Sequence, residues 1–249
     1  MTATPIPRTI ALTLYGDLDL SILDEMPPGR KQTKTWVISQ KKRKSAYKWI
    51  KNQIKQQHIQ AFIVCPFIEE SEYESMKNIK AAVKEFQKLS QKVFPKLKLG
   101  LLHGRMKIKE KEKVINEFKK NKINILVSTP VIEVGIDIPN ATIIIIEGSN
   151  RFGLAQLHQL RGRVGRSSEQ SYCLLFTQKQ KDYKRLYAMT KYNSGFKLAE
   201  VDLNLRGPGE VYGTRQHGFI NLKIASFNQV KLIEKTKKSA LKFINVMPG

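Results

Sequence analysis

Short apolar runs alternate with segments of helical periodicity along the first 178 residues of this chain. Residues 61–67 form a continuous apolar run, typical of a strand buried on both faces of a parallel sheet. Residues 42–57 place Ala46, Trp49, Ile50 and Ile54 on one face of a basic helix. This alternation predicts an α/β fold, with a mostly parallel sheet and helices on both faces. The expected strands are 35–39, 61–67, 97–102, 124–128, 141–147 and 171–177, and the expected helices are 42–57, 72–94, 109–120 and 154–164.

The pattern changes after Gln178. A helix is expected next, then a bend rich in glycine and proline at 207–213, and a last basic helix at 228–244. Short connections between the earlier elements indicate one compact domain. We therefore predict a compact domain at 27–178 and a separate helical appendage at 179–249, with 1–26 as a preceding segment.

The formal net charge of +23 favours a polyanionic partner. No stretch approaches the roughly 18–20 apolar residues of a membrane span, and no signal-peptide pattern opens the chain. Cys65 and Cys173 lie in apolar, strand-like runs, which indicates buried thiols, and nothing resembles a zinc spacing or a disulfide framework. We expect a soluble, cytoplasmic protein with no membrane contact and no metal site of its own.

One stretch of the chain is basic without compensation. No Asp or Glu occurs from Met26 to Ile68, although ten Lys and Arg residues do. Such a run predicts contact with phosphate groups. A solvated helix face is the alternative. The basic residues are Arg30, Lys31, Lys34, Lys41, Lys42, Arg43, Lys44, Lys48, Lys51 and Lys55.

Arginine is concentrated in a second stretch. Lysine outnumbers arginine three to one in the chain, yet Arg151, Arg161, Arg163 and Arg166 fall within sixteen residues. Arginine presents a planar, permanently charged fork that suits phosphate. In the segment QLRGRVGR (159–166) the glycines allow close backbone approach, so Arg163 and Arg166 fit arginine fingers that stabilise charge during phosphoryl transfer. A surface loop that only contacts nucleic acid is the alternative.

Five segments in succession resemble motifs of one helicase family. MTATPIPRT (1–9) looks like helicase motif III, LHGRM (102–106) is similar to the motif IV region, and VSTPVIEVGIDIPN (127–140) resembles motif V. RFGLAQLHQLRGRVGR (151–166) looks like motif VI, and DLNLRGPGEVYGTRQHG (202–218) resembles the translocation motif. The chain therefore resembles the C-terminal helicase region of the RecG family of superfamily-2 ATP-dependent DNA helicases. YGDLDLSILDEMPPGR (15–30) looks like RecG in particular.

The resemblance implies a RecA-like domain at 27–178, preceded by the tail of a first motor domain at 1–26 and followed by a translocation appendage. Arg163 and Arg166 would reach the nucleotide γ-phosphate across an interdomain cleft, and Gln159 would couple that cleft to DNA. Gly135 and Asp137 would line the cleft, although Asp137 alternatively caps a turn. The residues expected to contact DNA or to couple hydrolysis to movement are Thr2, Thr4, His103, Gly104, Arg105, Ser128, Thr129, Arg206 and Gln216. For Arg206 the alternative is a purely structural role that holds the appendage to the domain.

The chain departs from the family pattern in several places. Pro130 stands where a second Thr is common, and it has no N–H to offer a phosphate. His217 stands where the translocation motif often has Ser. The sequence contains neither a G-x-x-x-x-G-K-[ST] phosphate loop nor a D-E-x-H string. ATP and Mg²⁺ would then be held mainly by an absent first motor domain, and we expect the chain alone to be an inactive fragment.

The partners implied are duplex and branched DNA and the first RecA-like domain of the same protein, with the protein acting as a monomer near the bacterial nucleoid. Fork regression and branch migration of four-way junctions, in recombination and repair, are the activities implied. Two alternatives stay open at this point. One is a translocase of the transcription-repair coupling type, and the other is a non-catalytic DNA-binding fragment that acts by charge alone.

Overall fold

The computed structural model describes residues 29–66, 82–130, 138–178 and 183–206, and five positions between 235 and 243. Its centre is a six-stranded sheet in the order β1-β6-β5-β2-β4-β3, and every pair of neighbouring strands is parallel. The predicted α/β class with a parallel sheet is therefore confirmed. The strands are β1 (Lys34–Ile38), β2 (Gln60–Val64), β3 (Leu99–Leu102), β4 (Ile125–Ser128), β5 (Ala141–Ile146) and β6 (Tyr172–Phe176).

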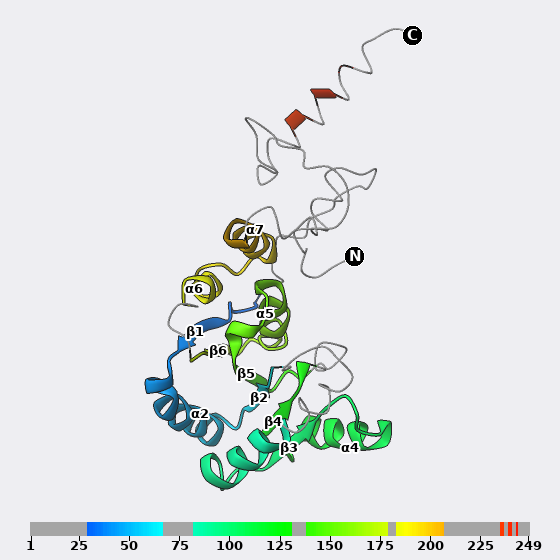
Figure 1. The fold of residues 1–249 in the computed structure, drawn as a ribbon. Helices are drawn as coiled ribbons and strands as arrows, with labels where there is room; N and C mark the ends of the chain where they lie inside the picture. The colour runs from blue at the N-terminus through cyan, green and yellow to red at the C-terminus, as the bar shows by residue number, and fades with distance from the viewer. Residues whose placement is uncertain are drawn as a thin grey trace. The chain divides into compact units, whose positions relative to one another are not determined.

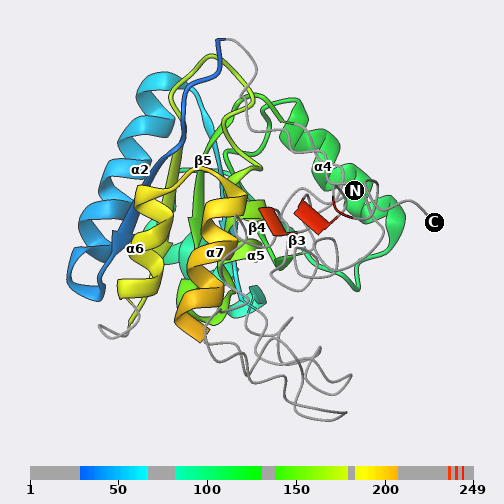
Figure 2. The same ribbon diagram turned by 90° about the horizontal axis from the view of Figure 1, so that it is seen from above.

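Helices cover both faces of the sheet (Figure 1). One face carries α2 (Arg43–Gln57) and the helical stretch 82–88, which continues into a π-helical turn, Leu89–Val93. On the opposite side lie α5 (Leu154–Arg161) and α6 (Tyr183–Lys191), and α6 packs against β1. The helix α4 (Ile108–Lys119) contacts the sheet through Phe118, whose ring lies 5.2 Å from that of Phe62. Figure 2 shows α2 at one side of the sheet and α4 at the other.

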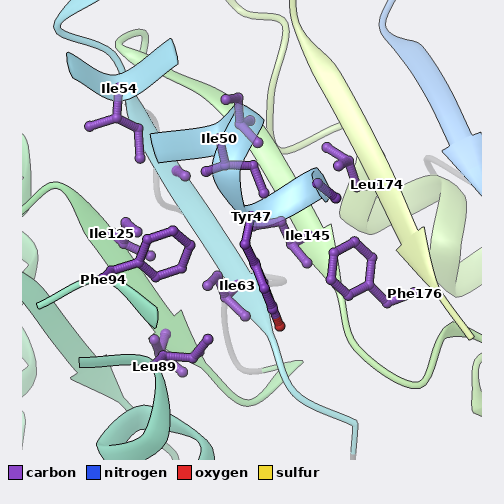
Figure 3. Packing of buried hydrophobic residues seen from close by; sticks show 14 of the residues in the cluster. Tyr47, Ile50, Ile54, Ile63, Leu89, Phe94, Ile125, Ile145, Leu174 and Phe176 are labelled. Carbon is purple, nitrogen blue, oxygen red and sulfur yellow. The ribbon is translucent and has the colours of Figure 1, made fainter. Parts of the chain in front are cut away.

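The core beneath α2 forms because alternate residues of each strand face this helix. Ile63, Ile145 and Phe176 point from neighbouring strands toward Ile50 and Tyr47 of α2 (Figure 3). Strand β5 is buried along its whole length, as expected for a central strand of a parallel sheet covered on both faces. Both cysteines are buried free thiols, as the sequence predicted. Burial raises the pKa of the Cys65 thiol well above its usual range.

One helical residue of the predicted face packs against the core but is less buried than the others. The buried residues of α2 are Ala46, Tyr47, Ile50 and Ile54. Trp49, which was expected on this face, is only half-buried and lies at the flank of the helix. It packs there against two aromatic rings at the edge of the sheet.

Contacts divide the chain into two compact units. The first, Met26–Asn193, holds the whole sheet and includes α6, which lies within the range 179–249 that the sequence assigned to the appendage. The second unit combines Met1–Glu25 with Ser194–Gly249 and includes α7 (Gly195–Arg206). The domain limits drawn from the sequence stay a prediction. Within the described residues, no helix has the length and apolar character to cross a membrane.

Candidate nucleotide and DNA site

The carboxyl ends of the parallel strands bring separate motifs to one edge of the sheet. Strand β3 ends at Leu102 and leads into His103, while β4 ends at Ser128 and leads into Thr129. The Thr129 N–H donates to the Leu102 carbonyl at 3.2 Å, and the Cys65 N–H donates to the Ser128 carbonyl at 2.8 Å. The segments that resemble motifs IV and V therefore lie side by side, as the predicted sheet required.

Three polar atoms at this edge have no hydrogen-bond partner. They are Oγ of Ser128, Oγ1 of Thr129 and Nδ1 of His103. Burying such groups unpaired costs about 1–3 kcal/mol each. Ser128 and Thr129 are 0% and 1% exposed, so a phosphate contact through either hydroxyl requires a rearrangement of the residues around it. Their predicted role at DNA therefore stays a prediction.

The loop after β3 is better placed to meet a ligand. Gly104 and Arg105 are both exposed. The Lys111 ammonium donates to the Gly104 carbonyl at 2.7 Å, which ties this loop to the first turns of α4. Burial and the nearby Lys111 lower the pKa of His103, so its imidazole is neutral at physiological pH. A neutral imidazole with one unpaired ring nitrogen can exchange a hydrogen bond with a ligand, but adds no charge.

A tight turn after β5 sets the start of α5. Gly148 has φ +54°, a left-handed conformation that favours glycine. The Ser149 hydroxyl donates to the Phe176 carbonyl at 3.0 Å, and the Arg185 guanidinium donates to the Asn150 carbonyl at 2.7 Å. Strand β6, through Phe176, and helix α6, through Arg185, therefore both hold the turn from which the motif VI helix begins.

Arg161 is a structural residue. Its side chain is buried, and its guanidinium donates to the carbonyls of Met189 at 2.8 Å, Tyr192 at 3.0 Å and Asn193 at 3.2 Å. These carbonyls lie at the end of α6 and in the segment after it, where a cation is favourable. The fourth contact is with Nδ1 of His158 at 3.0 Å. Of the four clustered arginines, this one is therefore committed to the fold.

Arg163 and Arg166 are placed differently. Both are half-buried, and they flank the buried pair Val164 and Gly165. Gly165 has φ +79°, and a Cβ at this position would lie 2.9 Å from Oγ1 of Thr33. The loop therefore needs glycine at 165, as the sequence indicated. Its carbonyl also accepts a hydrogen bond from the Nε–H of Arg30.

The first glycine of the motif, Gly162, does not make a tight turn, and its expected close approach to a ligand stays a prediction. Gly162 has φ −66°, which any residue adopts, and it caps the carboxyl end of α5. An added Cβ would approach only the backbone carbonyls of Gln159 and His158 at 3.3 Å and 3.6 Å. Gly162 is therefore not required for a tight turn. Gln159 itself is half-buried on the side of α5 opposite the buried leucines.

A buried ionic cluster was missed from the sequence. The Arg43 guanidinium donates to the Glu147 carboxylate at 2.5 Å and lies over the Phe176 ring, 4.9 Å from its centroid. The Tyr47 hydroxyl donates to the same carboxylate at 2.9 Å. Burial raises the pKa of Glu147, and Arg43 offsets part of that shift. The basic run predicted contact with phosphate groups. Arg43, however, pairs with Glu147 and is therefore not available to DNA.

Several predicted site residues lie outside the described part of the chain. These are Thr2, Thr4, Gly135, Asp137 and Gln216. Arg206 is the last residue of α7. No group of three or more His, Cys, Asp or Glu residues in the described ranges could hold a metal ion.

The contact between His158 and Arg161 makes stability depend on pH. Burial, with the nearby Arg161 cation, lowers the pKa of His158 to about 4 from its ordinary 6.5. The folded chain therefore excludes a proton that the unfolded chain binds below pH 6.5, so this stabilisation is present above pH 6.5 and is lost toward pH 4. Between pH 7 and 4.5 the native chain should lose about 2 kcal/mol more unfolding free energy than His158→Gln.

Urea denaturation of both proteins at the two pH values measures this difference. Gln keeps an acceptor for Arg161 but does not titrate in this range. Equal losses for the two proteins would show that His158 is protonated as readily in the folded chain as in the unfolded one.

The family described as helicase conserved C-terminal domain matches residues 41–168, and the family described as ATP-dependent DNA helicase RecG, domain 3, C-terminal matches residues 192–249. The chain is 53% identical over 228 residues to the ATP-dependent DNA helicase RecG of Synechocystis sp., covering 91% of this chain and 27% of that protein. It is 48% identical over 237 residues to the one of Thermotoga maritima, covering 94% and 30%.

Solved structures give the same picture. The structure of RecG bound to a three-way DNA junction matches with a TM-score of 0.69 and 46% identity, over 94% of this chain and 30% of that one. The Mss116p DEAD-box helicase domain 2 bound to an RNA duplex matches with a TM-score of 0.50 and 24% identity, over 66% of this chain and 62% of that one, which supports the fold alone. The chain spans about a third of the length of the curated relatives it matches.

Proposed function

We propose, on the premise that this chain belongs to the family of helicase conserved C-terminal domains, that it is the C-terminal motor half of an ATP-dependent DNA helicase that acts on branched DNA. The observation that carries the proposal is the match to RecG over nearly the whole chain, including the structure bound to a three-way junction. The placement of Arg163 and Arg166 on a pinned, half-buried loop adds support from the geometry.

The residues of this loop fit a nucleotide phosphate. Arg163 and Arg166 supply planar cationic donors, and the adjacent Ser167 has a buried hydroxyl with no hydrogen-bond partner. Bound ATP would supply the phosphoryl group whose transfer drives movement. Two guanidinium groups near it would stabilise the charge that develops on that group. Mg²⁺ would be held by the first motor domain, as the resemblance to the helicase family implies.

The DNA side of the site would lie at the carboxyl ends of β3 and β4. The loop of Arg163 and Arg166 instead packs beside Thr33 and Ser171, which precede β1 and β6. Arg105 is exposed, and the backbone around Gly104 is tied to α4, so this loop can meet a phosphate without ordering first. Ser128, Thr129 and His103 add polar atoms without partners at the same edge. Gln159, on the motif VI helix, would couple nucleotide to DNA. Gly135 and Asp137, with Thr2, Thr4, Arg206 and Gln216, keep the roles that the resemblance implies.

Closing and opening of the cleft between two such domains would move DNA past the protein. The first RecA-like domain of the same protein is therefore the proposed partner, and a monomer is sufficient for this cycle. The domain limits of 27–178 for the motor fold and 179–249 for the appendage belong to the same proposal, as does a place beside the bacterial nucleoid.

A chimaera tests the proposal directly. This chain would replace the matching 237 residues of the Thermotoga maritima helicase, and ATP hydrolysis would be measured with and without a three-way junction. We expect junction-stimulated hydrolysis by the chimaera, and none by this chain alone or by the relative truncated before this region. A chimaera that melts cooperatively and binds the junction, yet hydrolyses ATP no faster than the truncated relative, would contradict the proposal.

A further inference from the structure

Three aromatic rings meet at the β1 edge of the sheet. Trp36, on β1, stacks on Tyr172 with ring centroids 5.3 Å apart and planes 25° apart. Trp49, from α2, meets both rings edge-on, at 5.5 Å from Trp36 and 5.0 Å from Tyr172. Among the described strands β1 pairs with β6 alone, so this aromatic cluster lies at a sheet edge that no other described strand covers.

The outermost ring is held rigidly but left in contact with solvent. Trp36 is 40% exposed, while Phe62, Phe118 and Phe176 are each at most 1% exposed. Tryptophan is rarely fully buried but is highly buried on average, so an exposure of this size leaves part of the indole open to solvent. Trp36 presents part of a flat ring whose orientation is set by Tyr172 and Trp49. Such a ring is preorganised for stacking with another planar group.

The charge around the cluster selects the kind of partner. Residues 29–66, which contribute Trp36 and Trp49, contain no Asp or Glu. Lys34 is exposed on the same strand, two positions from Trp36 and so on the same face of the sheet. A row of lysines at helical spacing also runs along α2, on a different side of the helix from Trp49, namely Lys44, Lys48, Lys51 and Lys55. A polyanion is therefore favoured over an apolar or basic protein segment.

We propose that the Trp36 cluster is a binding platform for single-stranded DNA, on which an unpaired base stacks while Lys34 beside it meets a phosphate. In a duplex each base is already stacked on its neighbours, so only an unpaired base can cover the indole face. Positively charged surfaces that carry aromatic stacking positions are the general solution for binding single strands without sequence preference. The choice of DNA over RNA rests on the proposed function, but the stacking itself does not.

This platform is separate from the site at the carboxyl ends of the strands. Trp36 lies in the middle of β1, at one edge of the sheet, whereas His103 follows β3 and Ser128 ends β4, toward the other edge. The view in Figure 2 places β1 beside α2 and β3 beside α4. A junction whose duplex meets the β3–β4 side could therefore leave an unpaired strand to the β1 side.

The full chain itself provides the probe. Its only two tryptophans, Trp36 and Trp49, both belong to the cluster, so intrinsic fluorescence reports on no other region. In Trp49→Phe the emission comes from Trp36 alone. Titration with an oligothymidylate should quench this emission, and an abasic strand of equal length and charge should not. No ATP is added, so this result does not depend on whether the chain is part of an ATP-driven motor.

Substitutions at Trp36 separate stacking from charge and from folding. Trp36→Leu keeps an apolar side chain on β1, and Trp36→Phe keeps a ring. Affinity is measured by the fluorescence anisotropy of labelled oligothymidylate. We expect it to be about 5- to 150-fold weaker for Trp36→Leu and close to native for Trp36→Phe. The control Tyr187→Ala, which removes an exposed ring from α6, should leave the affinity unchanged. Unchanged affinity in Trp36→Leu, or equal binding and quenching by the abasic strand, would overturn the proposal and assign the exposed ring to a protein contact.

Discussion

Arg163→Ala is expected to lower junction-stimulated ATP hydrolysis of the chimaera by about 1,000-fold or more, while its melting temperature stays the same. An arginine that enters the nucleotide site stabilises the charge on the transferred phosphoryl group and is worth roughly 10³–10⁵ in rate. The half-buried position of Arg163 leaves the hydrophobic core intact when the side chain is shortened. Steady-state hydrolysis at saturating ATP and junction measures the effect.

Conservative and control variants make this result specific. Arg163→Lys keeps one positive charge but loses the planar fork, so we expect most of the rate to be lost here also. Lys191→Ala removes an exposed cation from α6 of the same unit and should leave the rate unchanged. A rate for Arg163→Ala within a factor of a few of native would mean that the loop contacts nucleic acid only, which was the alternative left open by the sequence.

The sheet could be predicted because its central strands are covered on both faces. Strands buried in this way are continuous apolar runs, and β5, with six buried residues in a row, is the clearest example. The ends of such runs are less certain than their centres, as at β2, which was expected at 61–67 and lies at Gln60–Val64, three residues short at its carboxyl end. The RecG resemblance is confirmed by relatives that are 42–53% identical.

The sequence could not show which arginines have structural partners, because these partners lie far away in the chain. Arg161 and Arg163 stand two positions apart in one motif, yet only Arg161 meets the carbonyls that follow α6. That partner comes from a helix more than twenty residues away in the chain, and no local pattern announces it. Arg43 is a similar case, because the Glu147 that pairs with it lies more than a hundred residues along the chain.

One signal of the buried ion pair was present in the sequence. Glu147 directly follows β5, whose six residues are all buried, and a carboxylate buried there needs a paired cation to offset the cost of burial. Its partner was ambiguous, because the basic run offered ten candidates.

Arg161→Ala is expected to lower the unfolding free energy by about 3 kcal/mol or more and the melting temperature by about 6–12 °C. The substitution leaves a cavity beside α5 and removes the donor to the carbonyls of Met189, Tyr192 and Asn193. Each buried acceptor left unpaired costs about 1–3 kcal/mol, and the loss acts where α6 ends. Urea denaturation followed by far-ultraviolet circular dichroism measures the change.

Arg161→Lys refines the test, because an ammonium group keeps the charge but cannot reach all three carbonyls in the fixed fork of a guanidinium. We expect it to recover part of the lost stability. Burial already lowers the pKa of Arg161, and a lysine at the same position would lose its proton more readily still, so the recovery should be smaller at high pH. If Arg161→Ala melted like the native chain while Arg163→Ala did not, the structural and nucleotide-facing roles assigned to the two arginines would be exchanged. A loss of stability in Arg161→Ala and a loss of hydrolysis in Arg163→Ala would therefore assign the first arginine to the fold and the second to the nucleotide.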